Sequence, residues 1–152
     1  MSFKLLAIRP LKGCSARFLK NLEEDRIYKF YNDYFFLENK NREITEIQCE
    51  DSVPKTLYEK SGLDIQISAL VGKNGSGKSS LLELLYASCS AIAINQKIIG
   101  NKNVDVEGLK VAIFYSIGNN CFEIEIINSK IKCYNINSKT KTKKQKDKTL
   151  KD

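Results

Sequence analysis

Residues 72–79 read Gly-Lys-Asn-Gly-Ser-Gly-Lys-Ser, and this stretch decides which fold the chain predicts. It fits the phosphate-binding loop (P-loop) pattern G-x-x-x-x-G-K-[ST] at every fixed position. Upstream, Asp64–Val71 (DIQISALV) alternates as a strand does, and downstream Ser79–Ile94 (SSLLELLYASCSAIAI) is typical of a helix. Strand, glycine loop and helix form the context in which this motif binds phosphate. The sequence therefore predicts an α/β unit around this loop, and the alternative is a glycine turn before a core helix.

The chemistry of a triphosphate explains why these residue types stand together. Glycines allow the backbone to turn its N–H groups toward a phosphate at a helix N-terminus. Lys78 would reach the β- and γ-phosphates, and Ser79 would give its hydroxyl to Mg²⁺. ATP and Mg²⁺ are therefore the predicted cofactors, with no catalytic residue identified. The predicted nucleotide-binding residues are Gly72, Lys73, Asn74, Gly75, Ser76, Gly77, Lys78, Ser79 and Ser80. The last, Ser80, is explained equally well as an ordinary residue of the first helical turn.

Charge and composition divide the chain into two parts. The net charge is +7, and residues 139–152, with seven lysines and two aspartates, carry +5 of it. We expect one lobe over residues 1–138 and a disordered lysine-rich tail over 139–152. The tail is either a solvated linker or a segment that touches nucleic acid through phosphates.

Composition also limits the environment of the chain. No apolar run is long enough to span a membrane and no signal peptide is evident, so a cytoplasmic protein with no membrane partner is expected. Five scattered cysteines and no histidine argue against a metal site other than nucleotide-bound Mg²⁺.

Short alternating segments elsewhere predict antiparallel strands on both sides of the loop. Before it, Phe3–Arg9 is a predicted strand, Ser15 a cap for a short helical turn over Ala16–Leu22, and Ile27–Leu37 an aromatic-rich strand paired with Glu43–Cys49. The aromatic cluster is expected either to pack in the core or to form a stacking platform for bases. After the loop, three segments separated by turns predict a β-meander. They are Lys110–Ser116, Cys121–Ile127 and Lys130–Ile136.

The residues V-G-K-N-G-S-G-K-S-S-L-L (71–82) resemble the ABC and SMC-like ATPases, P-loop NTPases of the broad AAA family ATPase group. The chain also resembles the ATPase subunits of bacterial antiviral defence systems, the OLD-like and Septu-type proteins. The resemblance implies the N-terminal lobe of such a P-loop NTPase, with antiparallel strands before and after the strand–helix unit. It also implies an ATP site that is completed by a partner subunit, in a homo- or hetero-oligomer.

Two motifs of those families have no counterpart after Lys78. No run of four apolar residues ends in Asp-Glu, and no Leu-Ser-Gly-Gly signature occurs. The acidic residues that follow the loop are Glu83, Asp105, Glu107, Glu123, Glu125, Asp147 and Asp152. Glu123 and Glu125 alternate within a predicted strand and are expected to face solvent. Because the carboxylate that orients water and metal is missing, hydrolysis is expected to need a C-terminal ATPase portion or a partner subunit.

Three functions stay open from the sequence. The first is the ATP-binding part of a truncated or split ATPase. The second is a non-catalytic nucleotide-binding interaction module, and the third is a small phosphotransferase, which would need a substrate-binding insertion and a catalytic acid.

Overall fold

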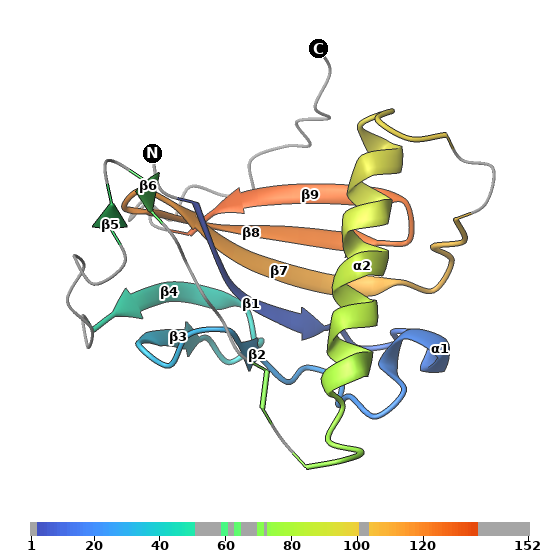
Figure 1. Cartoon of the computed structure of the whole chain (residues 1–152), viewed down its shortest axis with the longest axis horizontal. Helices are drawn as coiled ribbons and strands as arrows, with labels where there is room; N and C mark the ends of the chain where they lie inside the picture. The colour runs from blue at the N-terminus through green and yellow to red at the C-terminus, as the bar shows by residue number, and fades with distance from the viewer. Residues whose placement is uncertain are drawn as a thin grey trace.

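The main sheet of the protein is five-stranded and antiparallel throughout, with the order β2-β1-β7-β8-β9 (Figure 1). The computed structural model describes residues 3–50, 59–60, 63–64, 70–71, 73–100 and 104–136. The strands are β1 (Phe3–Pro10), β2 (Tyr28–Lys29), β7 (Lys110–Ile117), β8 (Asn120–Ile127) and β9 (Lys130–Asn135). Strand β1 therefore pairs with strands from both the beginning and the end of the chain.

The meander predicted after the loop is confirmed. Strands β7 and β8 meet at the pair Ile117 and Asn120, and β8 and β9 meet at Ile127 and Lys130, so each connection is a two-residue turn. Gly118 and Asn128 both have φ of +57°, which glycine and asparagine tolerate in tight hairpin turns. Local turn chemistry thus sets the register of all three strands.

The aromatic-rich segment predicted as one strand over Ile27–Leu37 is instead two strands. Its first part, β2, pairs with β1, and its second part, β3 (Tyr34–Glu38), pairs with β4 (Ile44–Cys49) in a separate hairpin. The chain leaves the main sheet between Phe30 and Tyr34, because β2 belongs to that sheet and β3 belongs to the hairpin that packs on one of its faces. The predicted pairing with the segment ending at Cys49 is confirmed for β3.

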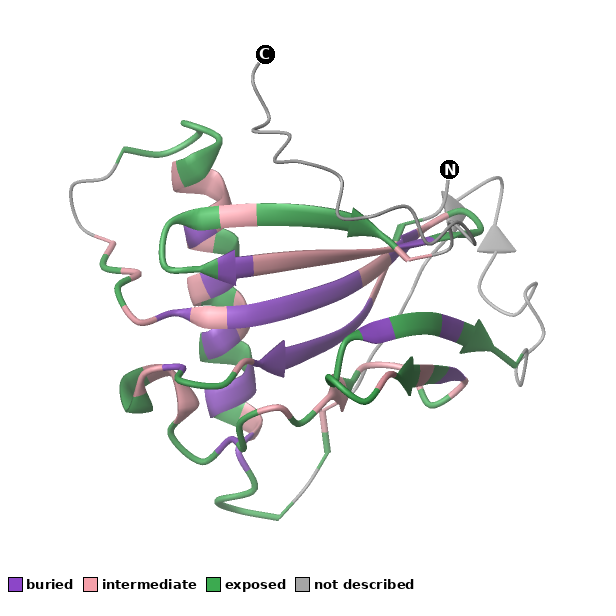
Figure 2. Ribbon diagram, turned by 180° about the vertical axis from the view of Figure 1, so that it is seen from behind, coloured by how far each residue is buried: buried purple, intermediate pink, exposed green. Residues whose placement is uncertain are grey.

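Side chains of the main sheet alternate between two apolar clusters, one on each face. On one face, Val111 and Ile113 pack with helix α2 (Lys78–Asn95), and on the other, Ala112 and Phe114 pack with the β3–β4 hairpin. Figure 2 shows the buried residues concentrated in the central strands and in the side of α2 that meets them. Tyr34 and Phe36 of the hairpin take part in this core, and Phe36 lies edge-on against Phe114 at 5.2 Å, whereas Phe35 is exposed.

Two helices complete the described structure. The short helix α1 (Ala16–Leu19) begins after Ser15, as predicted, although the Ser15 side chain makes no capping hydrogen bond and the helix is shorter than expected. The long helix α2 agrees with the helix predicted over Ser79–Ile94 within one residue at each end. Neither helix has the length and apolar character that crossing a bilayer requires, as far as the described residues go.

The predicted fold class, an α/β P-loop NTPase N-terminal lobe built on a strand–helix unit, is wrong. Every strand pair in the described residues is antiparallel, and α2 lies across an antiparallel sheet. Of the described residues in the strand expected over Asp64–Val71, which are Asp64, Leu70 and Val71, only Asp64 is in a strand. It belongs to β6 (Leu63–Asp64), which pairs antiparallel with β5 (Glu59–Lys60) outside the main sheet. Leu70 and Val71, next to the loop, are not in a strand.

The physical reason is that alternation alone does not determine a strand's partners. Strands β7, β8 and β9 pair through local turns, and β1 joins them through one long-range pairing with β7. Neither β6 nor the described residues Leu70 and Val71 belong to this sheet. Residues 65–69, Gly72 and the predicted lysine tail over 139–152 lie outside the described residues.

Candidate phosphate-binding loop

The loop predicted from residues 72–79 is described from Lys73 onward, and it leads directly into α2. Gly75 and Gly77 have φ values of +80° and +88°, in the left-handed region where glycine is favoured over residues with a Cβ. The backbone N–H of Ser76 donates to the carbonyl of Lys73 at 3.1 Å, which closes a tight turn. Gly75 and Gly77 therefore occupy positions where this backbone favours glycine.

Gly77 is the N-cap residue of α2, and its carbonyl accepts the first helical bond from Leu81 N–H at 2.9 Å. No side chain caps this end of the helix, and no acidic residue lies in its first turn. An N-terminus of this kind presents N–H groups and the positive end of the helix dipole to an incoming anion. The geometry at the start of α2 thus suits a phosphate group.

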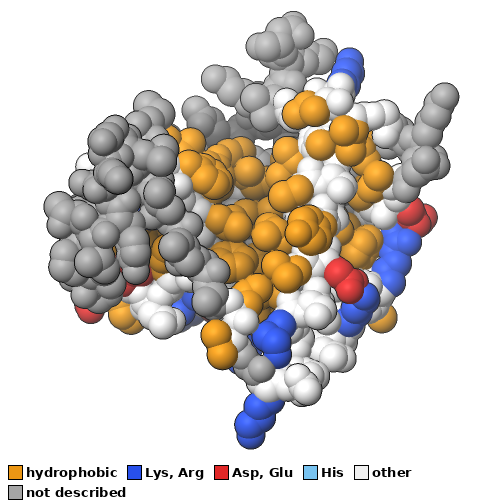
Figure 3. All heavy atoms as spheres, viewed as in Figure 1, with side chains coloured by type: hydrophobic (Ala, Val, Ile, Leu, Met, Phe, Trp, Pro, Cys, Tyr) orange, Lys and Arg blue, Asp and Glu red, His pale blue; other side chains and the backbone are white. Residues whose placement is uncertain are grey.

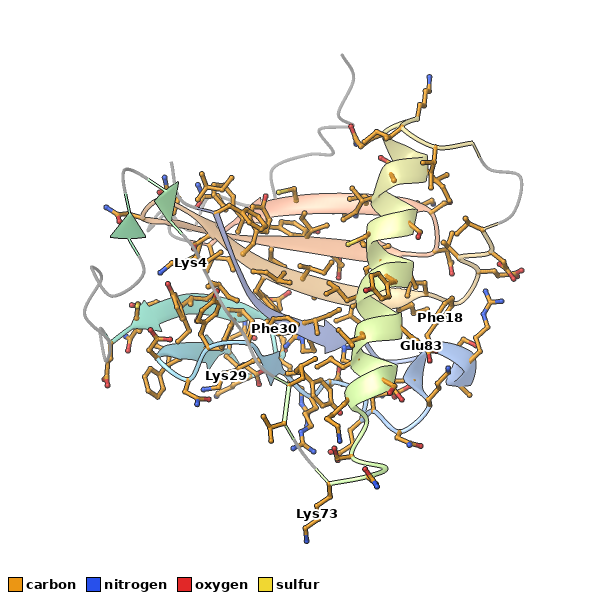
Figure 4. The ribbon with its side chains drawn as sticks, in the orientation of Figure 1. Lys4, Phe18, Lys29, Phe30, Lys73 and Glu83 are labelled. Atoms are coloured by element: carbon orange, nitrogen blue, oxygen red, sulfur yellow. The ribbon has the colours of Figure 1, made fainter. Side chains whose placement is uncertain are left out.

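The two lysines of the motif lie close to each other across the turn. The ammonium of Lys78 donates to the carbonyl of Lys73 at 2.9 Å, so its side chain folds back over the loop. Lys73 is exposed at the loop tip and points away from the body of the molecule (Figure 4). Asn74, Gly75 and Ser76 are also exposed. This end of the molecule therefore concentrates positive charge around exposed backbone.

The three hydroxyl residues of the motif have different surroundings. Ser76 and Ser79 are exposed, whereas Ser80 is 6% exposed and faces the protein interior. An exposed serine in the first turn fits Mg²⁺, which takes few protein ligands and keeps several waters. Among the described residues, no group of three or more acidic, cysteine or histidine side chains forms a metal cage.

The segment just after α1 borders the loop, which the sequence did not indicate. Lys20 forms an ion pair with Glu83 on α2, and Asn21 Nδ2 lies 3.5 Å from the carbonyl oxygen of Gly75. A Cβ on Gly77 would come within 3.1 Å of Leu22 Cδ2. No local pattern could have revealed these contacts, because they join residues more than fifty positions apart.

None of the described acidic residues that follow the loop lies in the first turn of α2. Glu83 is paired with Lys20, and Glu123 lies on β8 on the face covered by the hairpin. The prediction that Glu123 faces solvent is wrong, since its side chain is 16% exposed. Burial, with smaller contributions from nearby Glu125 and Glu43, raises the pKa of Glu123 to about 7, against the lowering effect of Arg9. This carboxyl belongs to the hairpin interface and not to the loop.

No family model, no curated protein and no solved structure matches this chain.

Proposed function

We propose that this protein binds Mg²⁺–ATP or ADP through residues 72–79. The observation that carries the proposal is the complete G-x-x-x-x-G-K-S motif, supported by two glycines in the left-handed region and an uncapped helix N-terminus next to them. A turn before a core helix, the alternative, needs neither the lysine nor the serine at these positions.

Each residue has a distinct task in this proposal. Backbone N–H groups around Gly75 and Gly77 donate hydrogen bonds to phosphate oxygens, and Lys78 leaves the carbonyl of Lys73 to contact the β- and γ-phosphates. Ser79 supplies one oxygen to Mg²⁺, and water and phosphate oxygens supply the rest. The exposed Lys73 and Asn74 lie nearest the end of the phosphate chain.

Hydrolysis is expected to need residues from a partner subunit or a further ATPase portion. Of the described acidic residues that follow the loop, Glu83, Asp105 and Glu123 face Lys20, Arg17 and Arg9, and the sequence contains no Asp-Glu pair after a run of four apolar residues. Phosphoryl transfer depends on a group that positions the attacking water and on charge stabilisation. We therefore propose a cytoplasmic nucleotide-binding protein that acts with a partner, in the manner of the ABC/SMC-like ATPases. A non-catalytic nucleotide-binding module is the second candidate.

Calorimetry with ADP and Mg²⁺ tests the binding proposal. Lys78→Ala should abolish the binding heat, because it removes the charge aimed at the phosphates. Lys40→Ala, in the exposed turn between β3 and β4, is the matched control and should bind as the wild type does. Equal affinity of the wild type and Lys78→Ala would overturn the assignment.

A phosphate-release assay tests whether the chain hydrolyses nucleotide without a partner. The isolated chain should show no turnover near the usual enzyme range of about 1 s⁻¹ or more. Turnover of that size that disappears in Lys78→Ala would reveal a catalytic acid within this chain.

A further inference from the structure

Three consecutive residues of the connection between α1 and β2 contact the loop or the first turns of α2. Lys20 pairs with Glu83, Asn21 approaches the carbonyl of Gly75, and Leu22 packs against the backbone at Gly77. Leu22 is 7% exposed and belongs to the same apolar cluster as Leu81 of α2. This connection, which we call the 20–22 segment, thus forms one wall of the loop.

The 20–22 segment is itself held in place by backbone hydrogen bonds on both sides. Before it, Ser15 N–H donates to the carbonyl of Gly108 at 2.8 Å, and after it Asp25 N–H donates to the carbonyl of Pro10 at 2.8 Å. Leu22 N–H donates to the carbonyl of Leu19 at 2.7 Å. The segment is therefore anchored to the last residue of β1 and to the turn just before β7, and the loop lies against this support.

We propose that Leu22 and Asn21 are positioning residues of the nucleotide site: they hold Gly77 and Gly75 in the conformation that presents the loop N–H groups to phosphate. This inference rests on the proposed function and adds to it a second segment that sets affinity. Contact with phosphate is not assigned to either residue. The site is made from two parts of the chain, 73–80 and 20–22.

The packing at Gly77 carries this argument. Gly77 is buried and left-handed at φ +88°, and the nearest atoms to a Cβ built there belong to Leu22 and to the Asn21 carbonyl at 3.6 Å. A glycine-rich loop has many accessible conformations. A neighbouring side chain that excludes all but the phosphate-binding conformation lowers the conformational entropy lost on binding. Truncating the Leu22 side chain would allow the loop to depart from the phosphate-binding conformation.

The test compares Leu22→Ala with Ile47→Ala, a matched control that is also 7% exposed but lies in the hairpin cluster on the other face of the sheet. Affinity for ADP with Mg²⁺ is measured at a temperature where both variants are folded. Leu22→Ala should weaken binding of ADP by about 10-fold, which corresponds to about 1.4 kcal/mol of binding free energy. Ile47→Ala should lower the thermal midpoint with unchanged affinity.

Two further variants sharpen the assignment. Leu22→Met keeps most of the side-chain volume and should restore affinity to within about 2-fold of the wild type. Asn21→Ala should weaken binding by about 2- to 3-fold, a smaller effect because its contact at 3.5 Å is at the limit of a hydrogen bond. A purely structural role for Leu22 would change the thermal midpoint and leave the affinity of the folded protein intact, which would overturn the proposal.

A ligand-free measurement keeps this inference separate from the proposed function. Amide hydrogen exchange in the peptide covering residues 73–80 should be faster in Leu22→Ala than in the wild type and Ile47→Ala. If the wild type binds no ADP, the proposed function fails, while exchange still reports whether Leu22 fixes the loop. Unchanged exchange in Leu22→Ala would refute the positioning role even if nucleotide binds.

Discussion

The two faces of the main sheet are held together by different forces. On the helix side, aliphatic side chains such as Leu84 and Val111 are fully buried, with no charge among the buried residues of the cluster. On the hairpin side, Phe114 is buried beside the guanidinium of Arg9, whose carbon lies 5.6 Å from the ring centroid, and Glu123 is close by. The stability of the helix side should therefore be independent of pH, whereas that of the hairpin side should depend on the ionisation of one carboxyl group.

Arg9 explains why the hairpin side tolerates a buried charge. Its Nη1 donates to Glu38 Oε1 at 3.1 Å and to the carbonyl of Arg42 at 2.9 Å, and its Nη2 lies 4.0 Å from Glu123 Oε1. The Nε of Arg9 is buried without a hydrogen-bond partner, the one such side-chain atom in the described residues. The arginine thus joins β1 to the hairpin and to β8.

Leu84→Ala should give the largest effect and tests the helix side. Removing a fully buried leucine costs about 2–5 kcal/mol of unfolding free energy, since transfer and cavity terms add. Urea unfolding should show the same loss at pH 6 and pH 8, because none of the buried residues of this cluster is ionisable. A loss that differed clearly between the two pH values would contradict the contrast between the faces.

Arg9→Met should give the next largest effect and tests the hairpin side. Methionine keeps the apolar stem but removes the donors to Glu38 and Arg42, so we expect a loss of about 1–3 kcal/mol in unfolding free energy. The loss should be greater at pH 8 than at pH 6, because ionised Glu123 then lacks its cation. A change within about 0.5 kcal/mol at both pH values would show that the arginine contributes little.

Titration of Glu123 should produce a smaller effect, a decrease in unfolding free energy as the pH rises. Its pKa is raised from 4.5 to about 7 in the folded protein, so the folded state holds a proton that the unfolded chain releases between these values. The stability from this proton is fully present below 4.5 and is lost as the pH rises through about 7. Unfolding free energy should fall by about 1 kcal/mol between pH 6 and pH 8.

Glu123→Gln removes this titration and is the direct check. The variant should have a flatter dependence of unfolding free energy on pH than the wild type over the same interval. Glu125→Gln is the matched control on the same strand, and it should keep most of the wild-type dependence. An unchanged slope in Glu123→Gln would assign the titration to another group.

These contrasts also show how far the sequence could predict the structure. The meander and α2 could be predicted because a two-residue turn such as Gly118-Asn119 and a long apolar helix are encoded locally. The burial of Glu123 could not, since alternation on β8 does not reveal that a hairpin from residues 34–49 covers one face.

The candidate site also has a part that could be predicted from the local sequence and a part that could not. The motif spacing along the chain indicated where Gly75 and Gly77 precede α2, and both have left-handed φ values, while nucleotide binding through the loop stays a prediction. The supporting residue Leu22 was missed, since its contact with Gly77 is a product of tertiary packing. The fold class was wrong for the same reason: Asp64–Val71 alternates like a strand, but strand pairing is decided by segments far away in the sequence.

Tyr86→Lys should give the smallest change in stability and tests the outer side of α2. Leu82 and Tyr86 lie one turn apart and are 41% and 69% exposed, and Figure 3 shows hydrophobic side chains spread over α2 and the adjoining sheet surface. An apolar surface of this kind favours association, so we expect light scattering to report species larger than a monomer at high concentration. Tyr86→Lys should shift this distribution toward monomer while changing unfolding free energy by no more than about 0.5 kcal/mol, because the side chain is mostly solvated in the single chain. Lys40→Ala, on the hairpin side, should leave the distribution as it is. A wild type that stays monomeric at high concentration would show that the outer side of α2 does not drive self-association, and it would favour a self-contained nucleotide-binding module over a protein that acts in an assembly.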